Sequence, residues 1–174
     1  EAARKKFVTG AKEINGVRII GIDVPGFGVP THAEAKDVLA GAMLKYARNE
    51  VQAGPVARPS GLETASDAPT VAMGGEIFPV DAITIGRMLQ PLGLKAGPVV
   101  PTREWRELYA ALDCSAVAML HPFYAATARE FKAAGRPLLG SAPVGVDGTR
   151  DWLTNLGNVL NLPQKQIDAA INAQ

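Results

Sequence analysis

Apolar residues follow two alternating patterns along the chain, one typical of buried strands and the other typical of amphipathic helices. Short continuous apolar runs predict strands over five segments, 17–24, 70–73, 97–100, 115–120 and 137–140. Between these runs, apolar residues recur every three or four positions, as on the buried face of a helix. Strands that are apolar on both faces and joined by helices indicate a parallel sheet covered on both sides. We therefore expect an α/β fold, a three-layer Rossmann-like sandwich with a mainly parallel sheet of about five strands.

Capping and turn residues place the helices of the first half. Thr31 and Glu34 form a T-x-x-E capping box at the start of a helix. Its expected buried face consists of Ala35, Val38, Leu39, Ala42, Met43 and Tyr46. Segment 52–69 holds three prolines and two glycines, which predicts a long surface loop. Pro79 and Asp81 suit the first turn of the next helix, and Gly93 ends it. The apolar stripe of that helix is Ile85, Met88, Leu89 and Leu92.

The second half repeats the pattern. Thr102 is expected to cap one helix, Gly135 to end the next, Asp147 or Thr149 to begin a third, and Pro163 to begin the last. Their apolar positions are Trp105, Leu108, Tyr109 and Leu112, then Tyr124, Ala128 and Phe131, then Trp152, Leu153, Leu156 and Val159. Residues 1–174 are therefore expected to form a single domain with its core over about 17–160. The helix in 161–174 is expected to lead into a neighbouring domain.

Composition supports a globular protein and excludes several classes. The 174 residues are 47% hydrophobic and 20% charged, as in ordinary folded domains. A net charge of +1 gives no basic field for nucleic acid, and no apolar run approaches the roughly 20 residues that span a bilayer. The single cysteine, Cys114, excludes a disulfide framework and an all-cysteine metal site within this chain. These features favour the cytoplasm, and a start at Glu1 rather than Met suggests a segment of a longer protein.

Candidate site residues follow the predicted strands, because ligands of open parallel sheets bind beyond the carboxyl ends of the strands. Those ends lead into 25–28, 74–79, 121–124 and 141–145, which are rich in glycine, proline and aromatic residues. Aromatic rings and close backbone approach suit a large, flat, partly apolar ligand. The candidate substrate-binding residues are Phe27, Glu76, Phe78, His121, Phe123 and Tyr124. The alternative is that these residues only form turns and pack against other domains.

Individual motifs stay open to a structural explanation. Gly26-x-Gly28 lies between a strand and a helix, but it lacks the third glycine of a dinucleotide fingerprint. Pro25 and Pro30 also remove amides that a pyrophosphate would need. His121 could donate a proton or bind a metal, or it could simply cap its strand. Glu76 fits a buried proton donor or a carboxylate at a helix start. Cys114 fits a core thiol, and Asp23 would matter if it were buried.

Two long segments resemble a known family. Residues 74–94, GGEIFPVDAITIGRMLQPLGL, and the turn Pro25-Gly26-Phe27 resemble parts of nitrogenase component 1 proteins. Residues 101–153 resemble the Y-type subunits of chlorophyllide reductases within that family. The likeness rests on Trp105, on the run His121-Pro122-Phe123-Tyr124, and on Gly140 to Gly145 with Gly148 and Thr149. It covers residues 17–160, nearly the whole chain.

The resemblance implies a fold and an activity for the whole enzyme. Such subunits have three Rossmann-like domains, of which this chain would be the middle one. Y and Z subunits form a heterotetramer with a 4Fe–4S cluster, and an ATP-dependent iron–sulfur protein, the X component, supplies electrons. The oxidoreductase reduces the C7=C8 bond of ring B of chlorophyllide a, a step of bacteriochlorophyll biosynthesis in photosynthetic bacteria.

The cluster cysteines of the family belong to the N-terminal domain, and Cys114 matches none of them. We therefore expect this chain to hold no cofactor or metal, to be inactive alone, to form a wall of the chlorophyllide pocket, and to self-associate through exposed interface.

Three alternatives remain at this point. A related protochlorophyllide reductase or a nitrogenase-like scaffold would share the same domain. A non-catalytic module that binds a tetrapyrrole or metal chelate could use a similar β-α fold. A nucleotide-binding domain would need the amides of 26–31 to contact phosphate.

Overall fold

A parallel sheet of four strands forms the centre of the molecule. The structure is a computed structural model. It describes residues 12–15, 17–22, 24, 28, 31–60, 68–75 and 82–174. The strands are β3 (Thr70–Gly74), β4 (Lys95–Val100), β5 (Ala116–Met119) and β6 (Leu138–Gly140), in the order β4-β3-β5-β6. Every pair is parallel, because each strand returns through a helical crossover.

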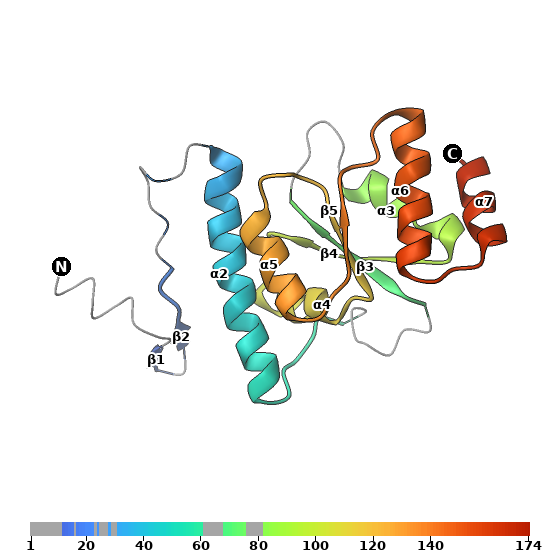
Figure 1. Ribbon diagram of the computed structural model, residues 1–174. Coiled ribbons are helices and arrows are strands. Elements are labelled where there is room, and N and C mark those ends of the chain that lie inside the picture. Colours follow the sequence, from blue (N-terminus) through green and yellow to red (C-terminus); the bar gives the residue numbers. More distant parts are fainter. Residues whose placement is uncertain are drawn as a thin grey trace.

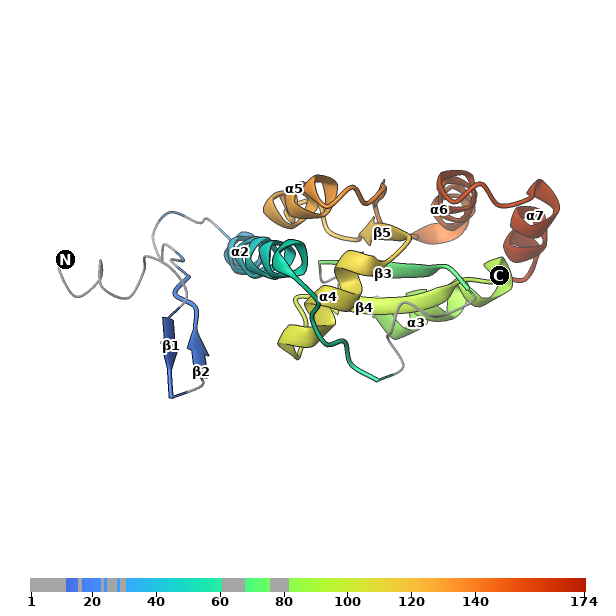
Figure 2. The same ribbon diagram turned by 90° about the horizontal axis from the view of Figure 1, so that it is seen from below.

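Helices cover both faces of this sheet. One face carries α2 (His32–Ala53), α4 (Trp105–Asp113) and α5 (Ala125–Ala133). The other face carries α3 (Ala82–Met88), the short 3-10 helix η1 (Gln90–Leu92), α6 (Gly145–Val159) and α7 (Gln164–Asn172). Figure 2 shows the two groups of helices at opposite sides of the strands. The predicted α/β class, with a parallel sheet between helical layers, is confirmed, with four sheet strands against about five expected.

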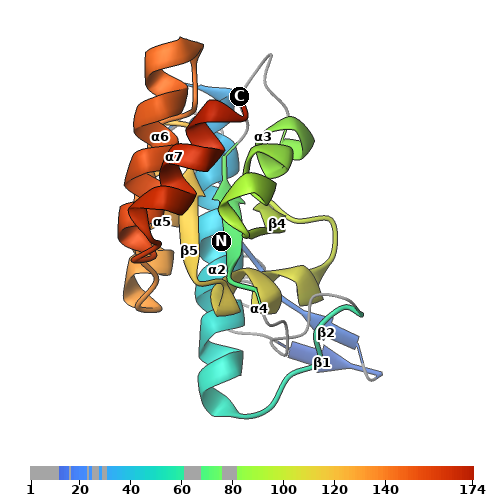
Figure 3. The same ribbon diagram turned by 90° about the vertical axis from the view of Figure 1, so that its right-hand side faces the viewer.

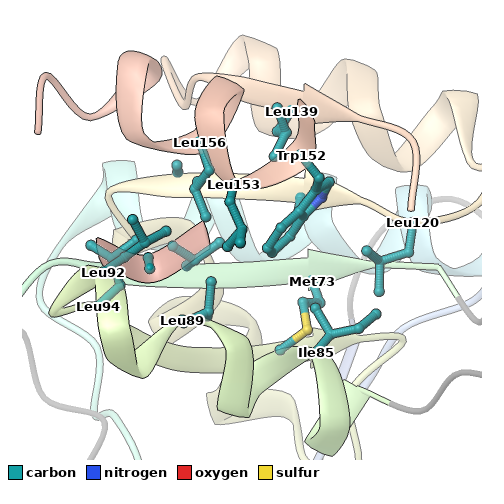
Figure 4. Packing of buried hydrophobic residues seen from close by; sticks show 14 of the residues in the cluster. Met73, Ile85, Leu89, Leu92, Leu94, Leu120, Leu139, Trp152, Leu153 and Leu156 are labelled. Carbon is teal, nitrogen blue, oxygen red and sulfur yellow. The ribbon is translucent and has the colours of Figure 1, made fainter. Parts of the chain in front are cut away.

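Two apolar cores separate the layers. Between the sheet and α3, α6 and α7 lies a cluster that includes Met73, Ile85, Leu89, Leu120, Leu139, Trp152, Leu153 and Leu156 (Figure 4). Between the sheet and α2, α4 and α5 lies a second cluster that includes Leu44, Val100, Leu108, Tyr109, Leu112, Cys114, Tyr124 and Phe131. The central strands β3 and β5 are buried on both faces, which is why their sequences are continuous apolar runs rather than alternating ones.

The last helix belongs to the first of these cores. Ile167 and Ala170 of α7 are buried there, and the side chain of Gln166 donates a hydrogen bond of 2.7 Å to the carbonyl of Leu92. Gly157 of α6 lets the Ile167 side chain approach closely. Figure 3 shows α7 beside α6, and α7 also packs against η1. The helix predicted after Pro163 is thus an integral part of this fold, and its continuation into a neighbouring domain stays a prediction.

Polar contacts fix the C-terminal part of α2. Arg48 forms an ion pair of 2.9 Å with Glu130 of α5. Farther along, the carboxylate of Glu50 accepts hydrogen bonds from the Trp105 indole, at 2.9 Å, and from the Tyr109 hydroxyl of α4. The helix is therefore tied to both helices that share its face of the sheet.

The prediction that residues 17–24 form a strand of the parallel sheet was wrong. Residues Lys12–Ile14 (β1) and Val17–Ile19 (β2) form a separate antiparallel hairpin, and neither strand joins the parallel sheet. Val17, Ile19 and Val24 are exposed rather than buried. An apolar run predicts a strand, but it does not tell which sheet the strand joins. In Figure 1 the hairpin lies beyond α2, away from the sheet.

The predicted buried face of α2 was also wrong. The residues buried there are Asp37, Ala40, Gly41, Leu44 and Ala47. The predicted apolar stripe lies on an adjacent face, where Leu39 is exposed and the others are partly buried. Small residues allow α2 to approach α5 closely, and closeness rather than side-chain size selects this face.

The structure confirms one predicted helix start and corrects two others. Thr31 caps α2 as predicted, with its hydroxyl accepting from the Glu34 amide at 3.2 Å. In contrast, α4 begins after Glu104, which forms a capping box with Glu107, while Thr102 lies farther upstream. Helix α6 begins at Gly145, ahead of Asp147 and Thr149. The start predicted at Pro79 and Asp81 lies outside the described residues. No helix in the described ranges is both long enough and apolar enough to cross a bilayer.

The thiol of Cys114 is predicted to be almost unreactive in the folded chain. It is 2% exposed, it donates to the Ala110 carbonyl at 3.3 Å, and burial raises its pKa. Because the thiolate is the reactive form, labelling by a thiol reagent should be about a thousandfold slower in the folded chain than in urea. Mass spectrometry of timed samples measures both rates. Rapid labelling without denaturant would contradict the burial of this side chain.

Candidate functional site at the carboxyl edge of the sheet

The strand order creates a switch point between β3 and β5. From β3 the chain crosses to β4 on one side, and later β5 lies on the other side of β3. The helices that follow β3 and β5, α3 and α5, therefore pack on opposite faces of the sheet, which is the topology at which ligands bind beyond the strand ends in such sheets. Hydrogen bonds join the two ends directly, since the Leu120 amide donates to the Gly74 carbonyl at 2.7 Å.

Aromatic side chains occupy the loop that follows β5. The His121 ring lies edge-on to the rings of Phe123, with centroids 5.2 Å apart, and Tyr124, with centroids 5.8 Å apart. The Phe123 amide donates to Nδ1 of His121 at 3.2 Å. A neutral His121 ring then carries its proton on Nε2, so the ring can offer one N–H donor to a ligand. The structure therefore brings three of the candidate residues together in one aromatic group.

The three rings differ in exposure, and the difference separates their roles. Phe123 is 48% exposed and His121 is half-buried, whereas Tyr124 is 1% exposed. Tyr124 belongs to the core between the sheet and α5. Its ring packs in that core beneath the loop. The surface that a ligand could contact is formed by Phe123 and His121.

Gly75 holds the loop from the β3 side. A Cβ atom at this position would come within 2.9 Å of the His121 Cβ and 3.1 Å of the Tyr124 ring. The residue also has a φ of 91°, a region that side chains rarely adopt. The backbone of β3 and the loop after β5 are therefore in direct contact at the switch point.

A carboxylate from α2 holds the other end of the loop. The Asp37 oxygens accept hydrogen bonds of 2.7 Å from the amides of Ala126 and Thr127, in the first turn of α5. The sequence analysis did not identify Asp37 as a candidate site residue. A signal was present, however, because the residues before α5, His121 to Tyr124, include no Ser, Thr, Asp or Asn that could cap the helix.

Exposed apolar side chains continue along the same edge. The exposed apolar side chains that follow the ends of β3, β5 and β6 are Ile83, Phe123, Val144 and Val146, and we call these four the apolar rim. Val146 also lines a cavity of about 440 Å³ between α3, α6 and α7. Exposed apolar side chains that follow several strand ends suit a ligand with a broad apolar face better than a small charged metabolite.

The remaining candidates are not tested by these contacts. Phe27, Glu76 and Phe78 lie outside the described residues, as do Asp23 and Gly26. Their roles stay predictions from the sequence. In the part of the chain that the structure describes, no three His, Cys, Asp or Glu side chains come together as a metal site would require.

Comparisons with known proteins give this chain a context. A family model for nitrogenase component 1 type oxidoreductases matches residues 2–174. The chain is 65% identical over 161 residues to a protein of Cereibacter sphaeroides named chlorophyllide reductase 52.5 kDa chain. It is 63% identical over 161 residues to the protein of the same name from Rhodobacter capsulatus. Each alignment covers 92% of this chain and 32% of the relative, so the chain spans about a third of the relatives' length.

Proposed function

The chain belongs to the nitrogenase component 1 type oxidoreductase family, and on that premise we propose that it is one domain of the catalytic component of a chlorophyllide a reductase. Identities of 65% and 63% to two chlorophyllide reductase chains support this assignment. The domain is proposed to be the middle one of three in the complete subunit. Alone it is proposed to be inactive.

The proposed reaction saturates the C7=C8 bond of ring B of chlorophyllide a. Two electrons and two protons add across that bond. The electrons come from an ATP-dependent iron–sulfur protein, the X component, and pass through a complex of Y-type and Z-type subunits. In that complex this domain supplies part of the pocket wall.

The observation that carries the proposal is the aromatic loop at the switch point. A tetrapyrrole presents a wide flat π-surface, and aromatic side chains bind such surfaces through stacked or edge-on contacts. Phe123 offers an exposed ring there, and His121, whose ring centroid lies 5.2 Å from that of Phe123, offers an N–H donor. These two side chains are proposed to contact the macrocycle, with the apolar rim extending the contact.

The iron–sulfur cluster of the proposed enzyme does not fit the residues of this chain. Cluster ligation uses several cysteine thiolates, whereas the sequence contains only Cys114. Its thiol is buried and donates to the Ala110 carbonyl. The cluster ligands are therefore proposed to come from other parts of the complex, and this domain binds and orients the substrate.

Removing the Phe123 ring tests the proposal. In the complete reductase, Phe123→Ala is expected to raise the KM for chlorophyllide a about 5- to 30-fold, because about 1–2 kcal/mol of ring contact is lost. The exposed ring makes few contacts within the domain, so the thermal midpoint should change little. Initial rates at graded chlorophyllide concentrations give the KM.

Leu39→Ala is the matched control. Leu39 is also an exposed apolar side chain, but it lies on α2, on the face turned from the core. The control should leave the KM within about twofold of the parent. An unchanged KM for Phe123→Ala, or an equal change in both variants, would remove substrate contact from this loop.

A further inference from the structure

Helix α5 begins without a capping side chain of its own. Its N-cap residue, Tyr124, makes no side-chain hydrogen bond to the helix. The first amides of a helix need acceptors, and the acceptor here comes from a residue 89 positions earlier in the chain. We propose that Asp37 is a positioning residue of the candidate site, which fixes the loop His121–Tyr124 by holding the start of α5.

The contact is buried and bidentate. Asp37 is 5% exposed, with Oδ2 accepting from the Ala126 amide and Oδ1 accepting from the Thr127 amide, both at 2.7 Å. One turn farther along α2, a Cβ at Gly41 would lie 2.9 Å from the Cβ of Ala126. The two helices therefore touch at backbone distance where the carboxylate reaches across. Two short charge-assisted hydrogen bonds allow little freedom in the position of the α5 start.

The carboxylate also decides what the switch point can bind. The amides at the start of a helix are the usual site for a phosphate or carboxylate of a ligand. Asp37 takes the amides of Ala126 and Thr127 from within the protein and brings its own negative charge. A ligand at this edge is then bound through its apolar face rather than through an anionic group on α5.

Asp37 acts on the site through the loop that precedes α5. Tyr124 adjoins the held turn, and His121 and Phe123 lie in the segment that connects β5 to α5. Gly75 limits the loop from the side of β3. The loop is thus held at both ends, by the β3 backbone and by Asp37, and this gives the Phe123 and His121 rings a fixed position. The positioning role rests on the proposed function, since it concerns the same substrate surface.

Asp37→Asn in the complete reductase tests the role. Asparagine has the same shape but presents an NH₂ group to one of the two amides, so one hydrogen bond is lost and the helix pair is retained. Hydrogen exchange of the amides of Ala126 and Thr127, followed by mass spectrometry without substrate, should become about tenfold faster or more. The KM for chlorophyllide a should rise about fivefold or more, and kcat should change less than about twofold.

Arg48→Met is the matched control, because it breaks the ion pair between the same two helices at Glu130. This variant should lower the thermal midpoint without raising the KM or the exchange of those two amides. Asp37→Glu is a second variant. Because it keeps a carboxylate, its KM is expected to lie between that of the parent and that of Asp37→Asn.

Each outcome has a defined meaning. Faster exchange and a raised KM in Asp37→Asn alone would support positioning. Unchanged exchange would overturn it. Faster exchange with an unchanged KM would overturn it as well, and Phe123→Ala then separates the two ideas. A raised KM in Phe123→Ala would keep the proposed function, whereas an unchanged KM there would reject the substrate surface itself. If Asp37→Asn and Arg48→Met both raised the KM in proportion to the fall in their thermal midpoints, Asp37 would be a purely structural residue.

Discussion

Trp152→Ala should lower the free energy of unfolding by about 3–5 kcal/mol, the usual range for removing a buried tryptophan. The side chain is among the largest that are fully buried. It projects from α6 toward the sheet, among Leu139, Leu153 and other members of the first core (Figure 4). Its removal leaves a cavity that a close-packed core cannot fill. Urea unfolding followed by circular dichroism gives the free energy and shows whether the m-value is retained.

Trp152→Phe separates packing from hydrogen bonding at the same position. The indole nitrogen is buried and has no hydrogen-bond partner among the described residues. Phenylalanine loses some contact area but also removes a donor that folding leaves unsatisfied, which carries a penalty of about 1–3 kcal/mol. The net loss should therefore be about 1 kcal/mol or less. A loss for Trp152→Phe as large as that for Trp152→Ala would show that the indole nitrogen makes a stabilising hydrogen bond.

Gly75→Ala should destabilise the chain by about 2–4 kcal/mol through two effects at once. The φ of 91° is strained for alanine, which costs about 1–3 kcal/mol. The new Cβ also meets the His121 Cβ and the Tyr124 ring at 2.9 and 3.1 Å. Because that loop carries the proposed substrate surface, the KM of the complete reductase should rise as well. Thermal unfolding and initial rates measure the two consequences.

Gly135→Ala isolates the backbone effect. Gly135 has a φ of 74°, and nothing lies within 4 Å of a Cβ built there. The variant should therefore show the conformational strain alone, about 1–2 kcal/mol, with an unchanged KM. If both variants lost the same stability and kept the same KM, the contact between Gly75 and the His121 loop would have no energetic weight.

The sequence predicted the elements of the sheet well, because buried parallel strands leave a strong local signal. The runs that became β3, β4, β5 and β6 were each found within one or two residues. Their crossover helices were found too, since apolar spacing depends only on nearby residues. The run at 17–24 shows the limit. Its strand character is local, whereas its sheet partner depends on residues distant in the sequence, so the hairpin β1–β2 was not predicted.

The buried face of α2 was predicted wrongly, and Asp37 was missed, for a related reason. Hydrophobicity selected Leu39, Met43 and their neighbours as the buried side. The structure instead buries Asp37 and Gly41, since a capping carboxylate and a close backbone contact hold α2 on α5. Neither contact is visible as an apolar period. The aromatic loop was predicted because topology alone brings strand ends together. The apolar spacing also placed Tyr124 with Ala128 and Phe131 on the buried face of its helix, and the structure confirms that burial, whereas the exposure of Phe123 comes from the coordinates.

The distant partners of α2 affect how the protein is made. The helix precedes its contact at Thr127 by 90 residues, and a ribosome adding about 5–20 residues per second needs roughly 5–18 seconds to produce that partner. During this interval α5 is still unmade, and α2 leaves the ribosome before its partner does. Nascent α2 therefore presents Leu44 and the small residues around Gly41 to solvent until α5 is made, and this stretch is accessible to a chaperone during that time.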